Sequence, residues 1–117
     1  MFNLSRLDRS NSNYIAAIDL GSNSFHMIIA KWDNDQLVVL DRLRDPVRMG
    51  WGLGSDGSLS EDARLRALNC LEKFGERLRE YPSRSVRIVG TKTLRSISDS
   101  TQFLADAQQR LGHPVEI

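Results

Sequence analysis

The chain has 117 residues, a length typical of one domain, and its 40% hydrophobic and 26% charged residues are the balance of a globular protein. This composition excludes a disordered or collagen-like chain. Sixteen basic and fifteen acidic side chains give a net charge of +1, which argues against a general nucleic-acid binder. The apolar runs are far shorter than the ~20 residues of a membrane span, and a single cysteine excludes a disulfide framework. We therefore expect a cytoplasmic protein that binds neither nucleic acid nor membrane.

The first predicted elements are a strand and a tight turn. Residues 1–13 are polar and predict a flexible leader. Residues 14–20 form an apolar run typical of a strand buried on both faces. Gly21–Ser24 predicts a tight turn, since glycine and asparagine tolerate a positive φ at little cost.

Two more strands are predicted to complete an antiparallel meander. Residues 25–32 resume as a strand, residues 33–35 predict a second turn, and residues 36–44 alternate as a third strand. The alternation of this third strand predicts that four side chains share one face: Leu37, Val39, Asp41 and Leu43.

The middle of the chain predicts a loop and then a helix. Four glycines between Met49 and Gly57 indicate a segment without regular structure, suited to lining a cleft. Ser60 is the expected N-cap of a helix that Pro82 closes, with an apolar stripe on one side. Cys70 lies in that stripe and is interpreted as a packing residue.

The last third predicts parallel strands joined by a crossover helix. Residues 86–90 predict a fourth strand, 91–95 a polar turn, 100–111 a second helix, and 115–117 the start of a fifth strand. The result is an α/β fold with a mixed, mainly five-stranded sheet. Because the chain ends just inside a strand, we expect it to be an N-terminal piece of a longer protein.

The strongest chemical signal is the segment Asp19–Ser24. It places a carboxylate at the end of a buried strand and follows it with a turn rich in N–H groups and hydroxyls. Successive N–H groups can form an anion-binding concavity, and Asp19 beside it is suited to Mg²⁺. The alternative is a plain hairpin whose polar side chains satisfy their own turn.

The segment Ala17–His26 resembles the first phosphate loop of the exopolyphosphatase/guanosine pentaphosphate phosphatase (Ppx/GppA) family, in the superfamily of actin, sugar kinases and heat-shock ATPases. The resemblance covers residues 14–117, and Trp51 departs from it where the family often has a short polar or acidic residue. It continues through four further segments: residues 43–50, 66–71, 89–95 and 114–117.

The resemblance implies a ribonuclease-H-like mixed sheet, with three antiparallel strands before parallel strands and crossover helices. Residues 14–117 would then be a truncated first subdomain that lacks the second phosphate loop and the second domain. Family members use Mg²⁺ to release terminal phosphate from inorganic polyphosphate or from guanosine pentaphosphate (pppGpp). The longer parent protein is expected to be such a hydrolase and a homodimer.

The resemblance also implies roles for individual residues. Asp19 would hold Mg²⁺, and Arg95 would be a catalytic cation on the phosphoryl group. The general-base glutamate of the family lies beyond this chain, so the chain alone is expected to be inactive. The phosphate oxygens would be held by four residues: Gly21, Ser22, Asn23 and Ser24.

Some assignments stay open at this level. An alternative function is a module that binds or senses a nucleotide or phosphate without hydrolysing it. His26 can face the site or the core, and Trp51 can stack on a base or shield the sheet edge. Arg42, Arg44 and Arg48 can line a path for a polyanion, or belong to an ordinary solvated strand face.

Overall fold

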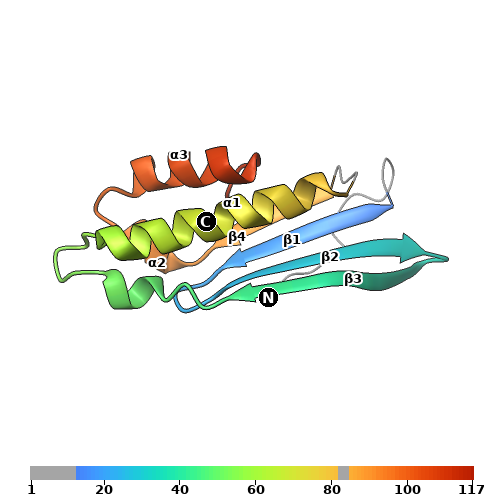
Figure 1. Ribbon diagram of the computed structural model, residues 1–117, viewed down its shortest axis with the longest axis horizontal. Coiled ribbons are helices and arrows are strands. Elements are labelled where there is room, and N and C mark those ends of the chain that lie inside the picture. The colour runs from blue at the N-terminus through green and yellow to red at the C-terminus, as the bar shows by residue number, and fades with distance from the viewer. Residues whose placement is uncertain (1–12, 82–84) are drawn as a thin grey trace.

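A mixed four-stranded sheet carries the helices of the protein on one face (Figure 1). The computed structural model describes residues 13–81 and 85–117. The strands are β1 (Tyr14–Leu20), β2 (Phe25–Asp33), β3 (Gln36–Asp45) and β4 (Ser85–Gly90). The helices are η2 (Met49–Gly52), α1 (Glu61–Arg79), α2 (Lys92–Ser96) and α3 (Ser100–Leu111). No helix among the described residues combines the length and the apolar character needed to cross a membrane.

The strand order is β3-β2-β1-β4, and the predicted antiparallel meander with a parallel strand beside it is confirmed. Strands β1, β2 and β3 form the antiparallel meander, and β4 returns parallel to β1 after the α1 crossover. The turn between β2 and β3 uses a positive φ at Asn34 and Asp35, the two positions where a tight hairpin needs it. Residues 1–12 of the predicted leader and Pro82 lie outside the described residues.

The predicted alternation along β3 is wrong, because the pairing of β2 with β3 shifts register between Ile29 and Ala30. Ile29 pairs with Asp41 and Ala30 pairs with Val39, so Asp41 and Val39 lie on opposite faces of the sheet. A bulge of this kind inserts one unpaired residue, here Leu40. Asp41 consequently faces α1, where its carboxylate pairs with Arg77 at 3.3 Å.

Three further expectations need correction. The glycine-rich segment is partly regular, since Met49–Gly52 forms a short 3₁₀ helix anchored by buried Met49. Residues 92–96 form the short helix α2, in place of a polar turn, with buried Leu94 packed into the core. The fifth strand is a single parallel bridge from Val89 to Glu116, too short to count as a strand.

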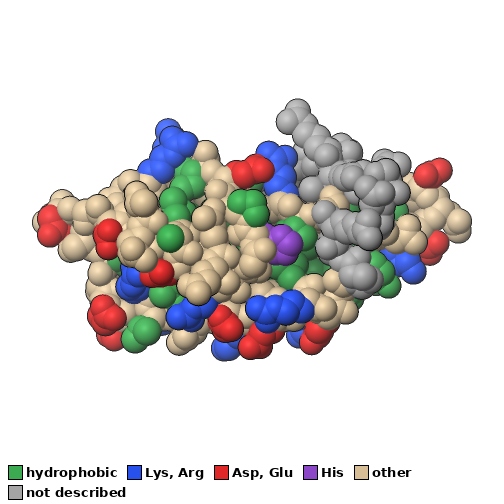
Figure 2. Space-filling model, turned by 90° about the horizontal axis from the view of Figure 1, so that it is seen from above, with side chains coloured by type: hydrophobic (Ala, Val, Ile, Leu, Met, Phe, Trp, Pro, Cys, Tyr) green, Lys and Arg blue, Asp and Glu red, His purple; other side chains and the backbone are tan. Residues whose placement is uncertain are grey.

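The core lies between the sheet and the two long helices. Alternate residues of β1 and β2, including Ile18 and Met27, face α1 and are fully buried. Helix α1 begins as predicted, with the Ser60 hydroxyl accepting a hydrogen bond from the Ala63 N–H at 3.2 Å. Helix α3 lies alongside α1, and the side seen from above in Figure 2 mixes acidic and basic side chains with small apolar areas.

Candidate functional site

The loop between β1 and β2 lies at the carboxyl end of β1 and is fixed through its carbonyl groups. The Gly21 N–H donates to the Ser24 carbonyl at 3.1 Å within the loop. From outside, the Arg48 N–H donates to the Asn23 carbonyl at 2.8 Å, and the Gly50 N–H donates to the Ser22 carbonyl at 3.1 Å. Three successive carbonyls of the loop are therefore satisfied by backbone N–H groups.

The N–H groups of the same three residues differ from their carbonyls in their hydrogen bonding. Within residues 13–81 and 85–117, the N–H groups of Ser22, Asn23 and Ser24 donate no hydrogen bond to the protein. Backbone N–H groups without a partner are strong donors, and a run of them is the composition of a backbone anion site. The loop can thus offer three donors to an oxyanion without giving up any internal bond.

Gly21 is needed in this loop for a reason other than the one the sequence suggests. No residue of the loop has a positive φ, so the expected conformational freedom of glycine and asparagine is not used here. A Cβ atom at Gly21 would instead lie 2.9 Å from the Ser24 carbonyl oxygen, closer than real Cβ contacts. The absence of a side chain lets the two ends of the loop close on each other.

Asp19 is half-buried, one residue before the end of β1 and on the sheet face away from α1. It pairs across the strands with His26, which in turn pairs with Arg44, so the three side chains form a row across β1, β2 and β3. They line a cavity of about 390 Å³. His26 is exposed on this face, which places it on the side of the candidate site and not in the core.

The donor set at Asp19 fits Mg²⁺ in one particular way. No group of three or more His, Cys, Asp and Glu suited to a metal occurs in the described part of the chain. Mg²⁺ is commonly held by one or two carboxylates together with waters and substrate phosphates, and does not need a complete protein cage. Asp19 has no ion pair or hydrogen bond with another described side chain, so its oxygens are available for such a role.

Arg95 is in the last turn of α2 and is exposed. The Thr91 N–H, just ahead of α2, donates to the Leu20 carbonyl at 3.2 Å, which sets α2 at the same sheet edge as the loop. The Arg95 guanidinium, however, donates to the Ile117 carbonyl at 2.8 Å. No hydrogen bond between described residues joins Arg95 to the loop, so Arg95 follows the same sheet edge as Asp19 and Gly21–Ser24 without bonding to them.

The segment after β3 has a part in the site that sequence reasoning missed. Residues 46–50 supply the two N–H groups that hold the loop, and the segment is itself held by the Arg66 guanidinium, which donates to the Val47 carbonyl at 3.0 Å. Backbone donors carry no residue signature, so no motif could have revealed this contact.

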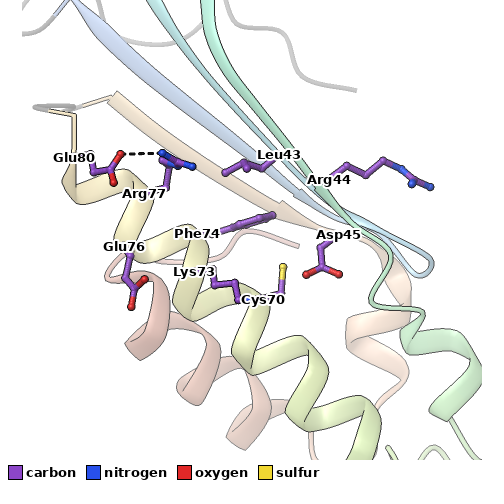
Figure 3. A pocket seen from close by; sticks show the side chains of 9 residues that line it. All are labelled: Leu43, Arg44, Asp45, Cys70, Lys73, Phe74, Glu76, Arg77 and Glu80. Atoms are coloured by element: carbon purple, nitrogen blue, oxygen red, sulfur yellow. Dashed lines mark hydrogen bonds and ion pairs between the residues drawn. The ribbon is translucent and has the colours of Figure 1, made fainter.

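A second cavity, of about 360 Å³, lies between β3 and α1, on the opposite face of the sheet (Figure 3). Figure 3 shows Asp45 turned toward Cys70, while Arg44 points away from this cavity. Burial, with a smaller contribution from Asp45, raises the pKa of the Cys70 thiol. Cys70 is only 2% exposed, which agrees with its interpretation as a packing residue.

Several known proteins are similar to this chain in sequence or in overall fold. The chain is 42% identical over 107 residues to the guanosine-5′-triphosphate,3′-diphosphate pyrophosphatase of Vibrio cholerae, covering 92% of this chain and 22% of that protein. An exopolyphosphatase from Cytophaga hutchinsonii matches with a TM-score of 0.80 and 31% identity, over 87% of this chain and 33% of that one. The Ppx/GppA enzyme of Aquifex aeolicus matches with a TM-score of 0.80 and 25% identity, over 88% and 34%.

The chain thus spans between 22% and 34% of the length of these relatives. The structural likeness confirms the expected fold class, a ribonuclease-H-like first subdomain with three antiparallel strands, a parallel strand and crossover helices. The model of one family, the Ppx/GppA phosphatases, matches residues 28–117. Since this match takes in most of the sequence and the fold agrees with it, the chain belongs to the Ppx/GppA phosphatase family.

Proposed function

We propose that this chain is the phosphate-binding, N-terminal subdomain of a phosphohydrolase that releases terminal phosphate from inorganic polyphosphate or guanosine pentaphosphate. The observation that carries the proposal is the loop Gly21–Ser24, in which the carbonyls of Ser22, Asn23 and Ser24 accept backbone hydrogen bonds while the N–H groups of the same residues donate none to the described part of the chain. The names of the Vibrio cholerae and Cytophaga hutchinsonii relatives support this choice of substrates.

The proposal gives each group a role. The N–H groups of Ser22, Asn23 and Ser24 hold oxygens of the terminal phosphoryl group, with Gly21 allowing the loop to close. Asp19 holds Mg²⁺ directly or through water; the ion, when bound, neutralises phosphate charge. Arg95 keeps guanidinium donors beyond the one that bonds Ile117, and these are available to a phosphoryl oxygen.

The chain alone is expected to hydrolyse polyphosphate only at the background rate. Phosphoryl transfer depends on the positioning of the reacting groups and on neutralisation of the phosphate charge. A subdomain that forms only one side of the active site supplies little of either. A phosphate-release assay with the purified chain, Mg²⁺ and polyphosphate measures this directly. Turnover well above a protein-free blank would contradict this part of the proposal.

Binding tests the role of Asp19. Isothermal titration calorimetry of the chain with pyrophosphate should show that Mg²⁺ tightens binding, and Asp19→Asn should remove most of a gain of about tenfold. The matched control is Asp33→Asn, which removes the same charge from an exposed position at the far end of β2. An equal effect of Mg²⁺ on both variants would exclude Asp19 as the metal ligand.

A further inference from the structure

A cavity of about 420 Å³ lies directly beside the phosphate loop, on the side of the segment that follows β3. Six of the described residues line it: Asn23, Ser24, Arg44, Pro46, Arg48 and Trp51. Two are arginines and none is acidic, so the cavity is suited to an anion. Because Asn23 and Ser24 belong to the loop, this cavity is continuous with the proposed site of the terminal phosphoryl group.

Arg48 is held beside the loop through its backbone. Its φ of 56° lies in the left-handed region, which an arginine adopts only where the surroundings enforce it. The Arg48 N–H donates a hydrogen bond to the Asn23 carbonyl at 2.8 Å. The backbone that carries the Arg48 side chain is therefore tied to the loop itself.

Trp51 orients the guanidinium of Arg48. The guanidinium carbon lies 4.4 Å from the centre of the Trp51 ring, within the range of a cation–π contact. Stacking engages the flat face of a guanidinium and leaves the N–H groups along its edge free to bind an anion. Trp51 is 75% exposed, so packing in the core does not explain why its ring lies against Arg48.

Arg44 approaches the same cavity from β3. It pairs with His26 across the strands, and its side chain points away from α1 (Figure 3). Among residues 13–81 and 85–117, neither Arg44 nor Arg48 has an acidic partner. Arg42, two residues earlier, does not line this cavity, although it lines the cavity beside Asp19 together with Arg44.

We infer that Arg44 and Arg48 bind the phosphoryl group next to the terminal one, which makes the site selective for condensed phosphate over orthophosphate. The inference rests on the proposed function of the loop. Arg48 offers a forked set of donors whose plane Trp51 fixes, and Arg44 adds a second unpaired cation to the same cavity. A free polyphosphate and a nucleotide triphosphate present the same chain of phosphoryl groups to this subsite.

Calorimetry of the chain with orthophosphate, tripolyphosphate and guanosine triphosphate, at fixed Mg²⁺, tests the subsite. Tripolyphosphate should bind about tenfold more tightly than orthophosphate, and Arg44→Gln with Arg48→Gln should abolish that gain by weakening tripolyphosphate more than orthophosphate. Lys73→Gln with Arg79→Gln is the matched control, because it removes two positive charges from exposed positions of α1, and it should keep the gain.

The outcomes of this experiment distinguish the Arg44 and Arg48 subsite from the proposed phosphate site at the loop. If orthophosphate and tripolyphosphate bind equally, or if the gain survives in the double variant, the subsite is wrong while the loop remains a phosphate site. If neither ligand binds, the proposed function fails and this inference fails with it. Equal affinity for tripolyphosphate and guanosine triphosphate supports recognition of the phosphate chain alone, whereas tighter nucleotide binding that Trp51→Ala abolishes supports a nucleotide-borne chain.

Discussion

Replacing Gly75 with alanine should lower the free energy of unfolding by about 2 kcal/mol. Gly75 is buried in the C-terminal third of α1, where the helix lies against α3. A Cβ atom at this position would lie 2.3 Å from the carbonyl oxygen of Arg110, in the backbone of α3. Backbone cannot move aside as a flexible side chain can, so the two helices must separate. Urea denaturation followed by circular dichroism measures the change.

The predicted loss of stability is opposite in sign to the usual effect of replacing glycine by alanine in a helix. In the interior of an isolated helix, glycine to alanine stabilises by about 1 kcal/mol, because alanine has the better helix propensity. Asn69→Ala, at an exposed position of α1, is the control and should follow that ordinary trend with a small gain in stability. If Gly75→Ala were as stable as the parent chain or more so, the close approach of α1 and α3 would be disproved.

Much of the fold could be predicted from the sequence, because its signals are local. The apolar run of β1, the stripe of α1 and the glycine that ends α3 each specify an element through neighbouring residues. The bulge in β3 could not be predicted in this way. It depends on how β2 and β3 pair, and the sequence of β3 taken alone continues to alternate across it.

The candidate site, like the fold, has a part that the local sequence predicts and a part that depends on contacts distant in the chain. The loop Gly21–Ser24 stands out in the sequence because of its residue types and its place after a buried strand. The contacts that hold it do not, since Arg48 and Gly50 reach it through backbone N–H groups from more than twenty residues away in the chain. Arg95 was assigned by resemblance, and its observed bond to Ile117 could not be deduced from its motif.

Replacing Gly21 with alanine should weaken pyrophosphate binding at least about tenfold, which corresponds to about 1.4 kcal/mol of binding free energy. The added Cβ would lie 2.9 Å from the Ser24 carbonyl oxygen, the same atom that accepts the Gly21 N–H. To relieve the contact, the loop must open and the 3.1 Å hydrogen bond must lengthen. The N–H groups of Ser22, Asn23 and Ser24 then lose the arrangement that lets them act together on one anion.

Gly50→Ala provides the matched control for Gly21→Ala, because Gly50 also bonds the loop but has room for a side chain. Its Cβ would meet only the Ser22 carbonyl oxygen, at 3.8 Å, and its N–H would still donate to that oxygen. Calorimetry should therefore give Gly50→Ala the affinity of the parent chain while Gly21→Ala loses it, with both variants remaining folded by circular dichroism. If both bind pyrophosphate equally well, the anion does not contact the loop backbone, because only one of the two changes disturbs the geometry of the unpartnered N–H groups.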